Sequence, residues 1–305
     1  MEAAVEAGPA GAVIQIIVLP ALSLCRSSSW LQSKNEILMR MEDSQLADDR
    51  MTTTRFTGGA EMILVTYAIV LSTYLVILFP TDVILALTVE DGLIESIGAI
   101  SFLLASGVFL AAYAYSSGLG NHLGSLRTRQ NTFYLLLGIL FLICFGEEIS
   151  WGQRAFHWMT PEWLKEINLQ GETNLHNIAL FHGKKVDGTQ KSGLDMLTNM
   201  NRLFSLFWLG FCVVVPVAHK FSRRMSGWCE WVGLPIVPLW IGGLFLAHAL
   251  VFQLVYESLA HADPSVRDGI NELKESNYAV LFLILALWEL KSVVLSRRQS
   301  VPAAY

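Results

Sequence analysis

The chain has 305 residues, of which 53% are hydrophobic and 15% are charged, and its mean hydropathy is +0.47. Soluble domains carry about a quarter charged residues, so the composition excludes an ordinary soluble enzyme and indicates a multi-pass membrane protein. The net charge of −5 offers no basic surface for nucleic acid. The four cysteines form no CxxC pair, which argues against a disulfide framework or a zinc knuckle.

The first 59 residues are predicted to form an N-terminal extension. Its apolar run over 10–25 follows acidic rather than basic residues and is interrupted by Pro20, so it does not fit a secretory signal peptide. We expect a targeting segment or an interfacial helix there. Residues 26–59 are polar and mixed in charge, which is typical of flexible chain.

Six apolar runs within residues 60–295 are long enough, or nearly so, to cross a bilayer as helices. We therefore predict an all-α fold: a polytopic transmembrane helix bundle of about six spans, followed by a C-terminal tail over 296–305. The predicted spans are, in chain order, Met62–Phe79, Leu93–Tyr115, Thr132–Glu148, Leu203–His219, Gly233–Tyr256 and Asn277–Leu295.

The distribution of Lys and Arg predicts the orientation of these spans. Bases gather in the N-terminal segment, in the connections 116–131 and 220–232, and near the C terminus, whereas the connection 80–92 has none. The positive-inside rule then places both termini in the cytoplasm. Almost every acidic residue at a helix end comes to the outer face in this topology, so the sequence predicts one polar site there.

The third predicted span ends in "FGEEISWGQRAF", which starts at residue 145. A charge buried in lipid costs about 2.5–3.5 kcal/mol, so both carboxylates need a partner, water or a metal. On a continuous helix Glu147 and Arg154 share one stripe, and Glu148 points about 100° away. Glu147 and Glu148 are therefore candidate catalytic residues, together with Arg154 and with His176 in the connection that follows. Arg154 is a candidate for binding an anionic group of the substrate or for pairing with one Glu.

The long connection 150–203 contains "WMTPEWLKEINLQGETNLHN". Thr160 and the proline after it predict the start of an amphipathic helix that lies at the membrane interface. Glu172 and His176 follow at i and i+4. If this segment is helical, the spacing suits a pair of metal ligands or a carboxylate that orients an imidazole; the alternative is a surface hydrogen bond.

Three further ionisable residues lie in or next to predicted spans. His248 lies inside the fifth span, where it is a functional candidate by default or else a packed, hydrogen-bonded residue. Glu95 and Glu275 begin the second and sixth spans within similar segments, a similarity that chance explains better than duplication. Both are additional candidates for the polar site. A divalent metal is the candidate cofactor, with Glu147, His176 and His248 as its ligands.

Two resemblances follow from these motifs. "GEEISWGQR" and "NLQGETNLHN" resemble a widespread group of multi-pass membrane proteins over about residues 60–295, which implies the fold and no particular activity. "FGEEISWGQRAF" is also similar to the first motif of the CAAX-type (Abi) intramembrane prenyl-protease family. That resemblance implies that Glu147 and Glu148 match the family's Glu-Glu pair. It also implies that Arg154 matches its arginine, with five intervening residues instead of three, and that His248 is its later-helix histidine, although no HxxxN motif follows.

Three functions remain open from the sequence. The leading hypothesis is an intramembrane hydrolase that acts on a lipid or a membrane-protein segment, with Glu147 or Glu148 as general base. The alternative is a proton- or cation-coupled transporter, in which the same acids bind protons or metal ions. The third is a non-catalytic membrane assembly subunit whose acids pair with loop arginines. All three expect membrane lipids as partners and no nucleic acid.

Overall fold

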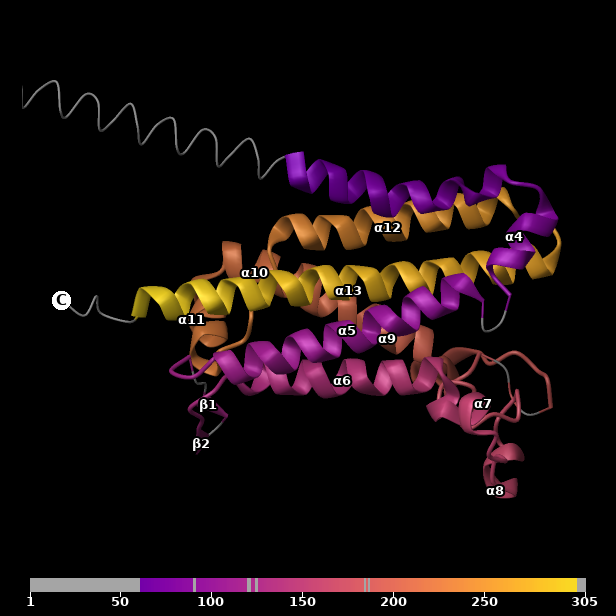
Figure 1. Cartoon of the computed structure of the whole chain (residues 1–305), viewed down its shortest axis with the longest axis horizontal. Helices are drawn as coiled ribbons and strands as arrows, with labels where there is room; N and C mark the ends of the chain where they lie inside the picture. The colour runs from indigo at the N-terminus through magenta and orange to yellow at the C-terminus, as the bar shows by residue number, and fades with distance from the viewer. Residues whose placement is uncertain are drawn as a thin grey trace, which may run out of the picture. The chain divides into compact units, whose positions relative to one another are not determined.

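The fold is an antiparallel helical bundle, taken here from a computed structural model. The described residues are 61–89, 92–119, 122–123, 126–183, 185 and 187–300. The predicted extension over 1–59 lies outside them. Residues from Thr66 onward form one unit, whose helices run back and forth along a common direction (Figure 1). In the described residues, strand is limited to a short antiparallel pair, β1 (His122–Leu123) with β2 (Leu126–Arg127).

Five helices in the described part of the chain are long and apolar enough to cross a membrane. They are Glu61–Leu78, α5 (Leu93–Tyr115), Met200–Phe221, α12 (Leu239–Ser258) and Pro264–Arg297. A further helix, α6 (Thr132–Glu148), has 17 residues and the bounds that the sequence predicted. The predicted all-α bundle of about six spans is therefore confirmed.

Shorter elements connect or subdivide these helices. The helix α13 runs from Pro264 to Ser300 and begins well before the predicted start at Asn277, since its first turns are amphipathic rather than apolar. The other elements are η2 (Thr73–Leu78), α4 (Thr81–Leu87), η3 (Ser150–Gly152), α7 (Gln153–Phe156), α8 (Glu162–Lys165), η4 (Gly193–Thr198), α9 (Met200–Leu209), the π-helical turn η5 (Gly210–Val214), α10 (Val215–Phe221) and α11 (Arg223–Val232).

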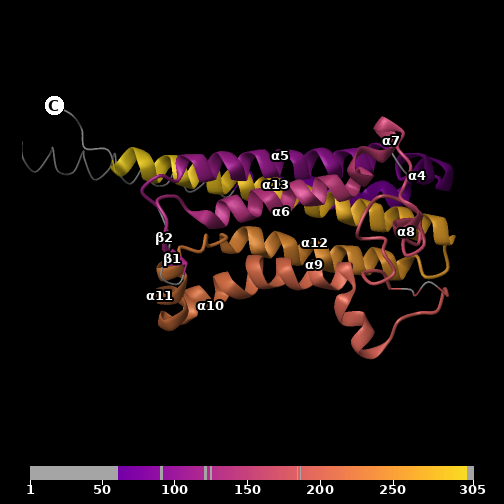
Figure 2. The same cartoon turned by 90° about the horizontal axis from the view of Figure 1, so that it is seen from below.

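Small residues allow α5 to pack closely against both α6 and α13 (Figure 2). A Cβ atom added at Gly98 would lie 3.2 Å from the Cα of Ser276 on α13. On the other side, the Ser106 hydroxyl donates a hydrogen bond of 2.8 Å to the carbonyl of Gly138 on α6. Small residues and interhelical hydrogen bonds are what bring helices together in lipid, where apolar burial alone gives no preference.

Long side chains of α6 and α13 meet along a seam of residues spaced by seven, a spacing that keeps them on one face of each helix, while the backbones of both helices pack closely against α5. Because the two helices are antiparallel, residues near the end of α6 match residues near the start of α13. The pair at the acidic end lines a common pocket, the middle pair packs with tilted rings whose centroids are 4.6 Å apart, and the third pair shares a hydrogen bond of 3.0 Å. These pairs are Glu148 with Glu275, Phe141 with Phe282, and Tyr134 with Glu289.

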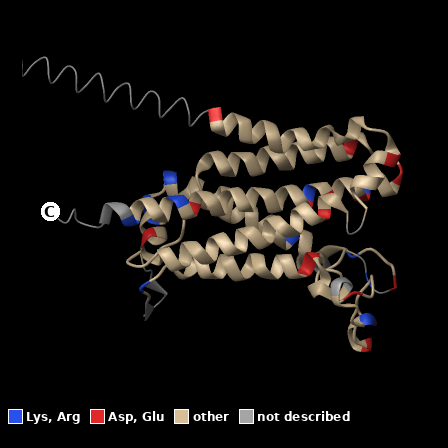
Figure 3. Ribbon diagram, viewed as in Figure 1, with Lys and Arg blue, Asp and Glu red and all other residues tan. Residues whose placement is uncertain are grey.

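The two ends of the bundle differ in charge. Figure 3 shows Asp and Glu gathered at the end that carries α4, α7 and α8, while Lys and Arg occur around α10 and α11 at the opposite end. The predicted gathering of acidic helix ends is therefore present in the fold. The side of the membrane on which this acidic end lies stays a prediction from the positive-inside rule.

Candidate functional site

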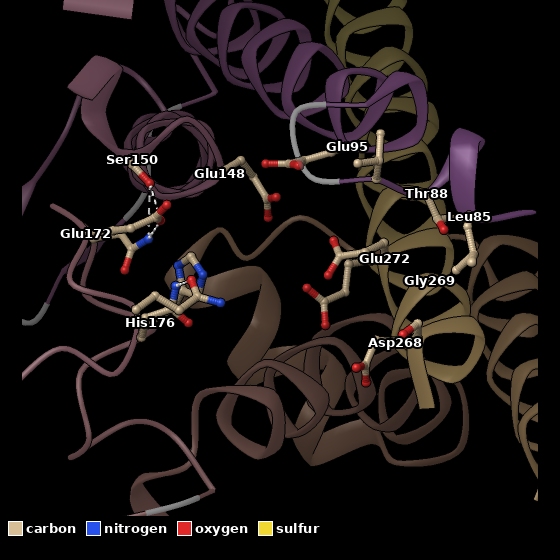
Figure 4. A pocket seen from close by; sticks show the side chains of 16 residues that line it. Leu85, Thr88, Glu95, Glu148, Ser150, Glu172, His176, Asp268, Gly269 and Glu272 are labelled. Carbon is tan, nitrogen blue, oxygen red and sulfur yellow. Dashed lines mark hydrogen bonds between the residues drawn. The ribbon is translucent and has the colours of Figure 1, made fainter. Parts of the chain in front are cut away.

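A pocket of about 450 Å³ opens at the acidic end of the bundle (Figure 4). The end of α4, the first turns of α5 and α13, the end of α6 and the loop 170–177 form its wall. No Lys or Arg among the described residues lines it. Its ionisable lining residues are Glu95, Glu148, Glu172, His176, Asp268, Glu272 and Glu275. Six carboxyl groups around one cavity repel one another when they are ionised, so the pocket favours the binding of protons or cations.

Several of these carboxylates are available to a ligand. Glu148, Asp268 and Glu272 make no hydrogen bond or ion pair with any other described residue. In Figure 4 the side chains of Glu148 and Glu272 extend from opposite walls toward the same space. Glu275 differs, because the Lys274 ammonium lies 3.2 Å from its carboxylate and offsets part of the charge.

Glu147, next to Glu148, has a different role. Its Oε2 accepts hydrogen bonds from the backbone N–H groups of Leu175 (2.6 Å) and His176 (2.9 Å), and its Oε1 accepts from the Trp151 indole (2.7 Å). The Nδ1 atom of His176 also lies 3.4 Å from Oε2. Glu147 is buried and fully engaged, so it attaches the loop 170–177 to the end of α6.

The chain makes a left-handed turn directly after α6. Ser150, Trp151 and Gly152 have φ angles of 45°, 53° and 80°, so the predicted continuous helical stripe from Glu147 to Arg154 is wrong. A Cβ atom at Gly146 would lie 2.9 Å from the Trp151 ring, and this glycine therefore makes room for the ring to fold back. Arg154 lies in α7, but its side chain is outside the described part of the structure, so its predicted role stays a prediction.

Glu172 and His176 are not on a helix, because residues 171–176 have no helical structure. The condition on which the spacing would suit a ligand pair, a helical segment, is therefore not met. The Glu172 carboxylate instead accepts hydrogen bonds from the Ser150 hydroxyl (2.7 Å) and the Asn174 side chain (2.8 Å), as Figure 4 shows. His176 is partly exposed and lines the pocket.

Amide side chains that the sequence reasoning missed hold this loop together. Asn168 donates to the Asn174 backbone and side chain, and accepts from the N–H groups of Gln170 and Glu172. The Gln153 side chain accepts from the Thr173 N–H at 2.6 Å. The segments "GEEISWGQ" and "NLQGETNLHN" are thus two halves of one hydrogen-bonded unit. The high content of Asn and Gln in these segments was the feature of the sequence that could have indicated a hydrogen-bonded loop.

His248 lies apart from this site. It is 0% exposed on α12, its Nε2 atom is 2.9 Å from the Tyr74 hydroxyl, and it does not line the pocket. Among the described residues, no three His, Cys, Asp or Glu side chains are arranged to hold a metal ion. The geometry therefore does not bring together Glu147, His176 and His248 as the ligand set that the sequence suggested.

The predicted interfacial helix is present as α8 and is short. It begins after Pro161, one residue later than predicted, and the Thr160 hydroxyl accepts from the Gln153 side chain instead of capping the helix. Met159 and Trp163 are 83% and 67% exposed. Exposed aromatic and apolar side chains beside membrane-spanning helices suit the lipid interface.

Comparisons with known proteins give no match from which a function could be inferred. The sequence matches no protein-family model, no curated protein and no solved structure. Both resemblances drawn from the motifs therefore stay predictions, and function has to be argued from the site. The protein is a multi-pass helical membrane protein with an acidic pocket at one end of its bundle.

Proposed function

We propose that the protein is a membrane carrier that binds a cationic solute in the acidic pocket. The supporting observation is the lining: six carboxylates and no Lys or Arg among the described residues. Carboxylates at helix ends near one membrane face are typical of substrate and ion pathways. A volume of about 450 Å³ lies in the range of small-molecule sites.

An organic cation fits this lining better than a directly coordinated metal ion. Direct coordination needs several ligands within about 2–2.6 Å of one point, and the described side chains offer no such group of three. Carboxylates distributed around a larger cavity can each accept an N–H of an amine. We therefore propose an ammonium compound as the solute, and a metal ion is one outcome of the test.

The hydrolase hypothesis receives less support from the same contacts. Glu147, one of its two proposed bases, is occupied by the Trp151 indole and by two backbone N–H groups. A water-activating role would therefore rest on Glu148 and His176, which line the pocket. The acidic lining also disfavours anionic phospholipid headgroups, because like charges repel when brought together with little water.

Spermidine binding to purified protein, measured by calorimetry, tests the proposal. Glu148→Gln and Glu272→Gln should each weaken binding at least about tenfold, since a lost charge within about 4 Å of a cation removes a few kcal/mol at protein surfaces. Glu257→Gln is the matched control, because Glu257 is exposed at the end of α12 and pairs with Gln253 outside the pocket. Added salt should weaken binding in the wild-type protein.

Two results would change or end the proposal. Mn²⁺ binding that depends on Glu148 and Glu272, without spermidine binding, would keep the cation pocket and replace the organic solute by a metal ion. If neither cation binds, or if both pocket variants bind as well as the wild-type protein, the proposal is refuted. Flux of the bound cation into liposomes that contain the protein then tests transport itself.

A further inference from the structure

A second buried carboxylate lies at the inner end of the α6–α13 seam. Glu289 on α13 is only 5% exposed, and its Oε2 atom accepts a hydrogen bond of 3.0 Å from the Tyr134 hydroxyl on α6. Tyr134 is buried as well. No Lys, Arg or His in the described part of the chain forms an ion pair with Glu289. Glu289 lies within the predicted sixth span and was not among the predicted site residues.

Aromatic side chains separate Glu289 from the acidic pocket. Glu275 and Glu289 are two seam repeats apart on α13, which corresponds to about 21 Å along a helix. Between them the Phe282 ring packs at a tilt against Phe141 with ring centroids 4.6 Å apart, and Phe109 of α5 stacks on Phe141 at 5.6 Å. All three rings are 0% exposed. Glu289 is therefore a site of its own and not an extension of the pocket.

Among the described residues, the surroundings of Glu289 offer one polar partner and no ion-pair partner. From α6 the partner is the neutral Tyr134 hydroxyl, and from α5 the Phe109 ring stacks on Tyr134 at 6.5 Å. On the α12 side, Trp240 packs against Trp288, the neighbour of Glu289. The ammonium of Lys291, two residues further along α13, lies over the Trp288 ring at 5.7 Å.

A proton satisfies this environment better than a buried charge does. An ionised carboxylate without a cation is strongly disfavoured in an apolar interior, and such groups usually neutralise by taking up a proton. In the protonated acid, one oxygen carries the proton and the other can still accept the bond from Tyr134. No bond other than the O–H bond of the acid is formed or broken.

We propose that Glu289, positioned by Tyr134, is a proton-binding site separate from the acidic pocket, and that it carries the proton exchanged against the cation. The second half of this statement rests on the proposed carrier function. The first half rests on the Glu289 contacts alone. In this arrangement the Phe141–Phe282 pair is the barrier between the cation site and the proton site.

Infrared difference spectroscopy of the full-length protein in lipid nanodiscs tests the proton site directly. The wild-type protein should show the carbonyl-stretch band of a protonated carboxyl group, and Glu289→Gln should remove it. Tyr134→Phe should shift the band, because the carbonyl oxygen loses its hydrogen-bond donor. Glu257→Gln, an exposed acid on α12, is the control that should leave the band unchanged.

The outcomes separate this proposal from the carrier proposal. A band that Glu289→Gln leaves in place overturns the proton site, and if that variant does not fold, an unshifted band in Tyr134→Phe does so. Loss of the band supports the site even when the pocket binds no cation, because the readout does not involve the pocket. In liposomes with an internal pH dye, wild-type protein should move protons when spermidine is added. Glu289→Gln should abolish that movement while spermidine binding persists; unchanged proton movement overturns the exchange role.

Discussion

Substitution by Gln should have different effects at the adjacent carboxylates: Glu147→Gln should destabilise the loop 170–177, and Glu148→Gln should weaken cation binding without destabilising the loop. In Glu147→Gln the remaining carbonyl oxygen can still accept from the N–H groups of Leu175 and His176, but the new NH₂ group then faces the Trp151 N–H. At least one hydrogen bond to a charged acceptor is lost, which costs about 1.5–3 kcal/mol. In Glu148→Gln no hydrogen bond to a described residue is lost, so the cost should stay within about 0.5 kcal/mol.

Amide hydrogen exchange, measured by mass spectrometry on the protein in detergent or nanodiscs, reports this difference where it arises. The loop 170–177 is attached to the bundle through Glu147, so Glu147→Gln should open it more often and raise its exchange rate about 10- to 100-fold. Glu148→Gln should leave that rate unchanged while it weakens spermidine binding. Equal exchange in the two variants would refute the division of roles between the neighbouring carboxylates.

Two glycine substitutions give further tests of the site's framework. Gly146→Ala places a methyl group 2.9 Å from the Trp151 ring and should cost about 1–3 kcal/mol of unfolding free energy, whereas Gly107→Ala on α5 meets no atom within 4 Å and should be neutral or stabilising by up to about 1 kcal/mol; thermal unfolding of both proteins decides between them. Gly269→Ala places a methyl group in steric conflict with the Thr88 hydroxyl and should push the pocket wall after α4 away from α13. Spermidine affinity should fall in this variant while the exchange rate of the loop 170–177 stays at the wild-type value, and unchanged affinity would contradict the close approach.

The helices were predictable to the extent that hydropathy and length determine them. The bounds of α6 match the prediction because its apolar run ends abruptly at the two Glu residues. The first turns of α13 were missed because 264–276 mixes charged and apolar residues, and such a segment is helical only when a partner covers its apolar face. The π-helical turn η5 has no composition signal at all.

Topology alone predicted that these acidic residues lie close together at one end of the bundle. It did not predict what each residue does there. Glu95, Glu148, His176 and Glu275 line one pocket because alternating helices bring every second end to the same face. Asp268 was missed because the prediction placed it in a loop. The separate role of Glu147 depends on a loop that returns from 28 residues downstream, and no local pattern reports such a contact. For Glu289 a signal did exist, since it follows Glu275 at twice the seam repeat.

The left-handed turn after α6 connects the stability of the protein to its pocket. Ser150 and Trp151 both have positive φ, which costs non-glycine residues roughly 1–2 kcal/mol each. The turn persists because its side chains form specific contacts: the Ser150 hydroxyl bonds Glu172, a pocket residue, and the Trp151 indole bonds Glu147. A continuous α6 would relieve the strain but would move Ser150 away from Glu172 and direct the chain toward the loop 170–177 along a different path. The strained backbone is therefore the local cost of placing Glu172 and His176 opposite Glu272 and Glu275.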